Sequence, residues 1–379
     1  MLTGLEARAI QRSKMSGSWF EIKNINELDS PALVVFPERV KHNIQLAIDM
    51  IGDVNRLRPH IKTNKSPEAA RLMLGAGITK FKCATIAEAE MLAQCNAPDV
   101  LLAYQPLGPK LHRFITLIKK YPATKFSCLT DNVAAANEQA TAFNANDLIV
   151  PLFIDLNVGM NRTGISPNEK AIELATHCLK LKGITLAGLH AYDGHIRDVD
   201  FEMKKQKCDE TFAAVKKLNE KLKLRVIIMG GSPAFSVHCK RRDIECSPGT
   251  FVYWDKGYTD LCPEQTFLPA AVLVTRIISL PSENKICLDL GHKSVAAEND
   301  IVKRIFFLNA EGLKPVGQSE EHLVLEISKN HSFKVGDIFY GLPYHVCPTV
   351  ALYERVFTVE QNLVTGEWKN VSRDRKITI

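Results

Sequence analysis

The stretch RPHIKTNK, residues 58 to 65, carries two lysines beside a histidine. Lys62 directly follows a short predicted strand, and Lys65 lies at the start of the next predicted helix. Most lysines of a globular protein are solvated surface charges. A lysine that is desolvated near other cations has a lowered pKa and can form a Schiff base with a carbonyl group. Lys62 is the better placed of the two for such a role, because it falls at a strand end.

Polar groups also follow three later predicted strands, in the stretches FIDLNVGMNRTGI, AGLHAY and MGGSPAF. The first ends in a glycine-rich turn with an arginine, the second supplies two flat rings that could stack on a heterocycle, and the third offers backbone N–H groups for a phosphate. An ion-paired arginine, a satisfied histidine and turn glycines are the alternatives. A lysine, a stacking ring and a phosphate site together describe pyridoxal phosphate. The candidate cofactor-binding residues besides Lys62 are Arg162, His190, Tyr192, Gly230, Gly231 and Ser232.

A candidate metal site lies in YHVCP, near the end of the chain. His345 and Cys347 are two positions apart, so in an extended strand both side chains would face the same side. An imidazole and a thiolate favour Zn²⁺ over Mn²⁺ or Mg²⁺. The spacing alone leaves open a buried histidine beside a structural cysteine.

The elements that would position these groups alternate in type from about residue 57 to residue 247. Amphipathic segments such as Ser66–Gly75, Ile86–Cys95 and Val199–Leu222 separate short β-branched runs. Ser66 and Ser166 each precede a proline and are predicted helix caps. Eight strand and helix units predict a (β/α)₈ TIM-type barrel, with catalytic groups at the carboxyl ends of the strands, whereas a doubly wound sheet rarely needs eight repeats. The predicted strands are Leu57–Ile61, Lys80–Ala84, Asp99–Tyr104, Thr124–Leu129, Leu148–Leu156, Ile184–His190, Arg225–Gly230 and Ile244–Ser247.

From about Thr266 the pattern becomes strand-like, in runs such as AAVLVTRIISL, KICLDLG and LVLEIS. We therefore divide the chain into an N-terminal extension (1–29), the barrel (30–260) and a C-terminal β domain (261–379) that carries the metal site. An early strand over Ala32–Phe36 is a candidate member of the second domain. The architecture predicted is α/β, with an added β domain.

Composition excludes several classes of protein. The chain is 46% hydrophobic and 24% charged, and a net charge of +6 is spread over 379 residues. We expect no nucleic-acid partner, because the basic residues form no extended patch. We expect no membrane partner, because no run approaches the ~18 apolar residues of a span. The N-terminus lacks the pattern of a secretory signal, and ten scattered cysteines suit reduced thiols. These features predict a cytoplasmic protein.

Several motifs resemble one known family when they are taken in order. VGMNRTGI resembles the segment of the alanine racemase barrel whose arginine contacts the phenolic oxygen of pyridoxal phosphate, which corresponds to Arg162. RPHIKTNKS, AYDGH, SPGTFVYWD, DLGHKS, SEEH and YHVCPTV resemble the D-serine dehydratase and D-threonine aldolase family, which is alanine racemase-like and of fold type III. The resemblance runs from about Ser30 to Val350. It implies that Lys62 carries the cofactor and that His345 and Cys347 bind the catalytic metal.

The family also separates two reactions by this metal pair. A histidine and a cysteine with zinc are typical of its dehydratases, whereas a histidine and an aspartate are typical of its manganese or magnesium aldolases. Two positions depart from related patterns. Asn64 stands where the family commonly has histidine, and Ser247 precedes Pro-Gly where alanine racemases have an arginine that binds the pyridine nitrogen.

The resemblance implies a pyridoxal phosphate- and zinc-dependent lyase acting on D-β-hydroxy amino acids, in the first place a D-serine dehydratase. The catalytic residues would be Lys62, which takes the Cα proton, and the metal ligands His345 and Cys347. D-threonine aldolase-type cleavage, an amino-acid racemase and a non-catalytic carrier of pyridoxal phosphate are the alternatives. A carrier would not need the β domain. The expected partners are a small D-amino acid and a second copy of the chain in a homodimer.

Overall fold

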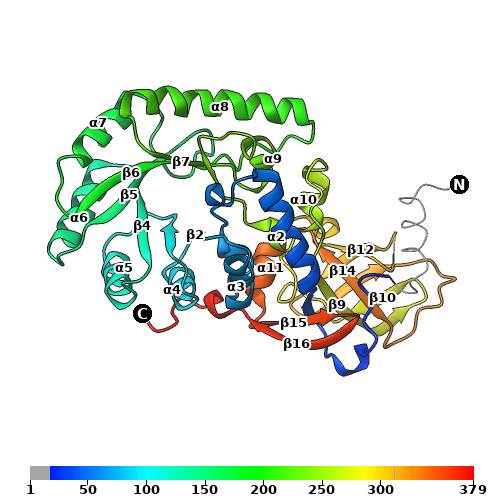
Figure 1. The fold of residues 1–379 in the computed structure, drawn as a ribbon. Helices are drawn as coiled ribbons and strands as arrows, with labels where there is room; N and C mark the ends of the chain where they lie inside the picture. The colour runs from blue at the N-terminus through cyan, green and yellow to red at the C-terminus, as the bar shows by residue number, and fades with distance from the viewer. Residues whose placement is uncertain (1–17, 311) are drawn as a thin grey trace, which may run out of the picture.

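The computed structural model describes residues 18–310 and 312–379. Residues 1–17, which include most of the predicted N-terminal extension, lie outside the described residues. Two units lie side by side in Figure 1, a barrel of parallel strands with outer helices and a largely antiparallel sheet. The predicted architecture, a barrel of parallel strands with an added β domain, is therefore confirmed. The exact domain limits stay a prediction.

The barrel sheet contains seven parallel strands in the order of the sequence. Their short, β-branched runs are almost wholly buried, as expected for parallel strands covered by helices. The strands are β2 (Lys80–Cys83), β3 (Asp99–Leu102), β4 (Lys125–Thr130), β5 (Val150–Leu156), β6 (Ile184–Ala191), β7 (Val226–Met229) and β8 (Glu245–Cys246).

Helices follow most of these strands and cover the outside of the barrel (Figure 1). Ser66 caps the first of them as predicted, because its Oγ accepts from the backbone N–H of Ala69. The cap predicted at Ser166 is wrong: the helix begins at Glu169 and Asn168 caps it. The helices are α2 (Pro37–Ile51), α3 (Pro67–Gly75), α4 (Ile86–Gln94), α5 (Pro109–Lys120), α6 (Val133–Asn144), α7 (Glu169–Cys178), α8 (Phe201–Leu222) and α9 (Phe235–His238).

The first predicted strand, Leu57–Ile61, is not a regular strand. The segment makes only isolated bridges, from Leu57 to Cys246 of β8 and from His60 to Lys82 of β2. Its N–H groups bond to the β8 side, but Pro59 has no N–H, so only the Pro59 carbonyl is left to bond to Lys82 on the other side. The segment thus occupies the first strand's place and joins the two edges of the sheet without a continuous ladder.

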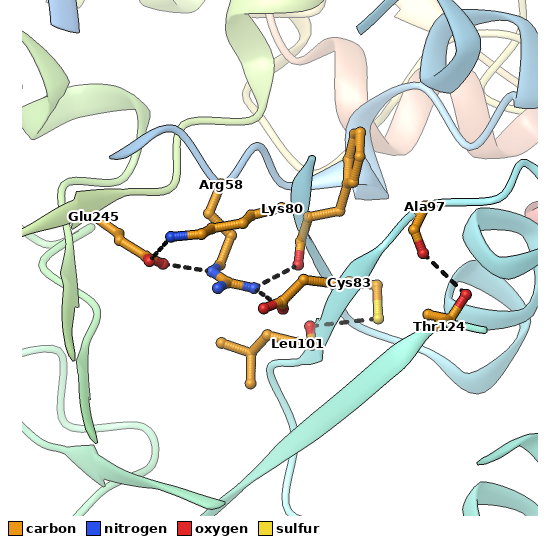
Figure 2. A network of polar contacts seen from close by, with 9 residues as sticks. Arg58, Lys80, Cys83, Ala97, Leu101, Thr124 and Glu245 are labelled. Carbon is orange, nitrogen blue, oxygen red and sulfur yellow. Dashed lines mark hydrogen bonds and ion pairs between the residues drawn. The ribbon is translucent and has the colours of Figure 1, made fainter. Parts of the chain in front are cut away.

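Ionic side chains reinforce this junction at the bottom of the barrel (Figure 2). The Arg58 guanidinium bonds to Glu245 of β8 at 2.7 Å and to Asp99 of β3 at 2.5 Å. Lys80 of β2 pairs with the other oxygen of Glu245. Arg58 is 3% exposed, so its charge is paired on both sides, as a buried charge requires. Above this layer the barrel interior is apolar, with Leu101, Leu129, Phe153 and Ile228 forming one cluster.

The second sheet has nine strands and is centred on β9 (Ala271–Ser282). The early strand β1 (Ala32–Val35) pairs antiparallel with β9 and parallel with β15, so it belongs to this sheet and not to the barrel. The remaining strands are β10 (Lys285–Leu288), β11 (Ile305–Phe307), β12 (Lys314–Gln318), β13 (Leu323–Glu326), β14 (Ile338–Pro343), β15 (Arg355–Glu360) and β16 (Leu363–Lys369). Two helices, α10 (Lys256–Leu261) and α11 (Val346–Leu352), also belong to this part of the chain.

The end of the chain returns to the barrel and lies beside α4 and α5 (Figure 1). Buried Glu90 of α4 accepts hydrogen bonds from the N–H groups of Thr378 and Ile379, and Arg113 of α5 donates to the carbonyl of Arg375. None of the ten cysteines is in a disulfide, in agreement with reduced thiols. No helix in the described part of the chain is long and apolar enough to cross a membrane.

Candidate active site

A cavity of about 850 Å³ opens at the carboxyl ends of the barrel strands, and Lys62 lines it. Lys62 lies in the short 3-10 turn that follows the barrel junction, where its N–H donates to His60 Nδ1 at 3.2 Å. Lys65 is engaged elsewhere, in an ion pair with buried Glu88 at 2.5 Å. The structure therefore distinguishes the two lysines of the opening motif, and it leaves Lys62 at the cavity.

His190 lines the same cavity at the end of β6, and it is held by a carboxylate that the sequence analysis did not single out. Asp155 of β5 lies in register with His190, and its Oδ1 is 2.7 Å from His190 Nδ1. Although burial acts in the opposite direction, this hydrogen bond keeps the pKa of Asp155 below its ordinary value. Burial lowers the pKa of His190. The pair fixes the ring and leaves buried Nε2 without a partner among the described residues.

Arg162 and Tyr192 meet at the cavity wall. The Arg162 guanidinium carbon lies 5.2 Å from the centre of the Tyr192 ring, within the range of a cation–π contact. Both residues line the cavity with His190, and their roles in stacking and anion binding stay predictions. An exposed arginine beside a half-buried ring is free to reach a ligand oxygen.

The glycine turn Gly230–Ser232 is buried and lies behind Tyr192, not on the cavity surface. Gly231 donates its N–H to Asp193 Oδ1 at 3.2 Å. Ser232 Oγ accepts the N–H groups of Gly249 and Thr250, both at 3.1 Å. The N–H groups that converge here therefore come from two turns, the second of which the sequence analysis missed.

Asp193 belongs to a buried cluster with His238 and Cys208, whose potential ligand atoms all lie within 4.8 Å of one another. Arg241 Nε donates to His238 Nδ1 at 3.1 Å, so the hydrogen of the neutral ring is on Nε2. That nitrogen is 2.8 Å from Asp193 Oδ2. The short contact between His238 and Asp193 holds Asp193 beneath Gly231 and accounts for the cluster.

The predicted metal pair lies where β14 passes into α11. His345 caps the helix and Cys347 is in its first turn, so the extended strand expected for YHVCP is wrong. The two side chains still lie together. His345 Nδ1 is 2.5 Å from Glu298 Oε1, and Cys347 Sγ is 3.2 Å from Thr63 Oγ1. Thr63 is the residue after Lys62, so the β domain brings this pair to the barrel lysine.

The charges around the pair favour a thiolate and an imidazolium. Against the effect of burial, the hydrogen bond to Cys347 raises the pKa of His345 to about 9. Burial also opposes ionisation of Cys347, but the hydrogen bond from His345 and the charge of Lys62 lower the pKa of its thiol. His345 lines a second cavity of about 640 Å³ with Tyr258 and Tyr344. Lys62, the neighbour of Thr63, lines the first cavity, whereas His345 lines the second.

A second lysine of the cavity was not predicted. Lys82 of β2 is 2% exposed, and its Nζ donates to Ser247 Oγ at 2.5 Å. Burial and the charge of Lys62 lower its pKa to about 7. The pattern Lys80-Phe81-Lys82-Cys83 places both lysines on one face of β2, which is an available sequence signal for inward-facing cations.

The residues of the cavity fit pyridoxal phosphate on observations of this structure. His190 presents a buried nitrogen that has no partner among the described residues, and Lys62 and Arg162 supply an amine and a guanidinium to the same space. His345 and Cys347 supply the nitrogen and sulfur donors that zinc prefers. Asn64, which replaces the family histidine, is buried, and its Nδ2 has no partner within the described residues.

Comparison with known proteins identifies the class to which this fold and site belong. Residues 36–256 match the family described as Alanine racemase, N-terminal domain, and residues 270–359 match the Putative serine dehydratase domain. The first match covers more than half of the chain. The protein therefore belongs to the alanine racemase-like family of fold type III pyridoxal phosphate enzymes, which confirms the resemblance found in its motifs.

Individual relatives cover nearly the whole chain. D-threonine aldolase of Arthrobacter sp is 24% identical over 358 residues, which are 91% of this chain and 93% of the aldolase. D-threo-3-hydroxyaspartate dehydratase of Delftia sp. (strain HT23) is 23% identical over 360 residues, 86% of this chain and 93% of the dehydratase. The crystal structure of D-threonine aldolase from Filomicrobium marinum has a TM-score of 0.83 at 22% identity, covering 94% of this chain and 98% of that one.

Proposed function

We propose that this protein is a pyridoxal phosphate-dependent lyase acting on D-amino acids that carry a β-hydroxyl group. Its reaction is dehydration and deamination to a 2-oxo acid and ammonia, with D-serine or a substituted D-serine as substrate. Lys62 carries the cofactor, and His345 and Cys347 hold a zinc ion. The relatives named above are an aldolase and a dehydratase of D-β-hydroxy amino acids, which supports the substrate class.

The observation that carries the proposal is the contact between Cys347 Sγ and Thr63 Oγ1 at 3.2 Å. Thr63 directly follows Lys62, so this contact brings the nitrogen and sulfur donors of the β domain close to Lys62. Thr63 and Cys347 are 284 positions apart in the sequence. A metal ion held by His345 and Cys347 would therefore lie beside a substrate bound at Lys62. A racemase needs no metal donors at this position.

Each residue of the site has a distinct task in this reaction. Lys62 binds the cofactor through Nζ and, once released by the substrate amine, takes the proton from the substrate Cα. Pyridoxal phosphate, when bound, supplies an electron sink for the pair left at Cα. Arg162 orients the cofactor by its phenolic oxygen, and His190, fixed by Asp155, supports the ring face. The Gly230–Ser232 turn lies behind the Tyr192 ring, so it meets the cofactor phosphate only when that ring moves aside.

The metal pair would serve the leaving group. A β-hydroxyl departs poorly as hydroxide, and a Lewis acid at that oxygen makes the departure easier. His345 keeps Nε2 for the ion because Nδ1 faces Glu298, and the lowered pKa of the Cys347 thiol makes the thiolate easier to form. D-threo-3-hydroxyaspartate dehydratase has been solved as a cysteine-to-alanine mutant in a metal-free form and as a histidine-to-alanine mutant. The two mutated positions are two apart, as His345 and Cys347 are.

Aldol cleavage to glycine and an aldehyde is the second candidate, because the Arthrobacter relative is named an aldolase. In that reaction the metal would instead promote deprotonation of the β-hydroxyl, and the Cα–Cβ bond would break. A thiolate ligand favours zinc, whereas a carboxylate in its place favours harder ions such as Mn²⁺ or Mg²⁺. Cys347 therefore supports the dehydratase reading.

Product analysis tests the proposal. The purified protein, loaded with pyridoxal phosphate and zinc, should convert D-serine or D-threo-3-hydroxyaspartate to a 2-oxo acid and ammonia. A chelator should abolish turnover and leave the bound cofactor's absorbance in place. Cys347→Asp should lose dehydration disproportionately to binding of the cofactor. Glycine and an aldehyde as main products would replace the dehydratase by the aldolase, and full activity after chelation would remove the metal from the reaction.

The homodimer and the cytoplasmic location stay predictions from the sequence. Light scattering during size-exclusion chromatography measures the first. A mass of twice 42.3 kDa would support it.

A further inference from the structure

Lys82 and Lys204 are the two buried lysines among the described residues, and of these two only Lys82 has no carboxylate partner. Lys65 pairs with Glu88, Lys80 pairs with Glu245, and Lys204 pairs with Glu264 at 2.7 Å. Lys82 forms no ion pair within the described part of the chain, and the hydroxyl oxygen of Ser247 is its only hydrogen-bond partner there. An ammonium group has three donors, so two of them are available at Lys82.

A buried ammonium group without a carboxylate partner costs stability unless another group offsets its charge. Lys82 is 2% exposed, which removes most of the compensation that water gives to surface lysines. Asp155 and Asp193 raise its pKa at a distance, whereas Lys62 and Arg58 lower it. A purely structural role would be served better by an apolar side chain. Lys82 lines the cavity, so a ligand is the natural partner for its free donors.

The position of Lys82 is below that of Lys62. The bridge from His60 to Lys82 puts Lys82 level with a residue two positions before Lys62 on the neighbouring segment. Its Nζ lies 5.6 Å from the centre of the Tyr192 ring, and Arg162 contacts the same ring from the cavity wall. Lys82 and Ser247 therefore form a polar pair on the side of Tyr192, level with His60 and below the backbone of Lys62.

This inference rests on the proposed function, in which the cavity takes pyridoxal phosphate. The cofactor has four polar points, and three have partners in that proposal: the aldehyde carbon at Lys62, the phenolic oxygen at Arg162 and the phosphate at the Ser232 turn. The fourth is the ring nitrogen, which lies across the ring from the aldehyde. We propose that Lys82, with its partner Ser247, donates a hydrogen bond to the ring nitrogen of the bound cofactor.

The chemistry of this contact differs from that of a carboxylate at the same place. A carboxylate stabilises a protonated ring, whereas an ammonium or a hydroxyl donor stabilises the nitrogen as an acceptor without a proton. An unprotonated ring is the weaker electron sink. The reaction then depends more on assistance at the β-hydroxyl, which is the task of the metal pair at His345 and Cys347.

The test compares the affinities of the apo-protein for pyridoxal phosphate and for its 1-deaza analogue, in which carbon replaces the ring nitrogen. A hydrogen bond from a charged donor should make wild type prefer the natural cofactor by about 10- to 100-fold. Lys82→Met should reduce the preference to about threefold or less. Lys110→Met is the matched control, since this lysine also lines the cavity but lies over the Tyr104 ring at 3.7 Å. It should keep the wild-type preference.

A second measurement does not depend on any variant. The ¹⁵N chemical shift of ring-labelled pyridoxal phosphate in the wild-type protein should be that of a hydrogen-bonded, unprotonated nitrogen, and a pyridinium shift would overturn the inference. An unchanged preference in Lys82→Met would overturn it as well. If pyridoxal phosphate does not bind to the wild type at all, the proposed function fails first. If the cofactor binds and neither ligand is preferred, only the role of Lys82 fails.

Discussion

Replacing Gly231 by alanine isolates one contact of the proposed cofactor site. Gly231 has φ −66° and ψ 176°, which any residue adopts, so the backbone itself tolerates a side chain. A Cβ at this position would lie 2.7 Å from Cε2 of Tyr192 and 3.3 Å from Cδ2. The ring must move by about 0.7 Å to restore an ordinary contact, and such overpacking costs roughly 1–3 kcal/mol. Tyr192 is only half-buried, so we expect about 1–2 kcal/mol, at the lower end of this range.

The same displacement should reach the cofactor. Tyr192 carries the cation–π contact with Arg162, and both residues line the cavity. A loss of about 1–2 kcal/mol corresponds to an affinity for pyridoxal phosphate that is lower by about 5- to 30-fold. Urea unfolding of the apo-protein measures the loss of stability, and fluorescence titration with the cofactor measures the loss of affinity.

Gly75→Ala provides the matched control. Gly75 lies in α3, and a Cβ added to it would have no other atom within 4 Å. Alanine there should stabilise the protein by about 0.5–1 kcal/mol and leave cofactor affinity unchanged. If Gly231→Ala matched wild type in both assays, the packing of Tyr192 against the Gly231 turn would have no role in stability or in binding.

Three further predictions concern charged residues. Lys62→Ala should abolish the pyridoxal phosphate label that borohydride reduction fixes on the protein, and a label that persists or moves to Lys65 would contradict the assignment. Glu245→Gln should cost about 2–4 kcal/mol in urea unfolding because it leaves buried Arg58 with Asp99 alone; a loss below about 0.5 kcal/mol would show that the ionic layer is not needed. Lys82→Met should stabilise the apo-protein most at about pH 7 and below. The folded-state pKa of Lys82, about 7, is depressed below that of the unfolded chain, so wild type gains stability as pH rises from about 7 to 10 and the advantage of the variant shrinks. An advantage that is independent of pH would refute this origin.

The sequence predicted the barrel well because its signals are local and repeated. Alternating β-branched runs and amphipathic helices specify parallel strands, and Ser66 before Pro67 specifies a helix start. The sequence predicted a regular strand over Leu57–Ile61, but Pro59 lacks the N–H group that a continuous ladder needs. Long-range bridges to β8 and β2 still hold the segment in the place of the first strand. The helix at Val346 was missed because His345 and Cys347, two positions apart, match the alternation of a strand, whereas His345 is the extended residue that directly precedes the helix.

The candidate site was predictable at the positions where the side-chain type itself indicates a chemical role. Lys62, Arg162, His190 and Tyr192 do line one cavity. The partners that orient them were not predictable, because they depend on which strands lie side by side. Asp155 reaches His190 through the register of β5 and β6. The contact of Thr63 with Cys347 depends on how the β domain lies against the barrel, which no local pattern encodes.

A crystal structure of the protein grown with pyridoxal phosphate and zinc, with anomalous data collected at the zinc edge, tests the central claim most directly. We predict continuous density from Lys62 Nζ to the cofactor and one strong anomalous peak bound by His345 Nε2 and Cys347 Sγ. The bond lengths should be near ~2.0–2.1 Å and ~2.3 Å. A peak at the buried cluster of Asp193, Cys208 and His238 instead, or a cofactor bound away from Lys62, would contradict the account.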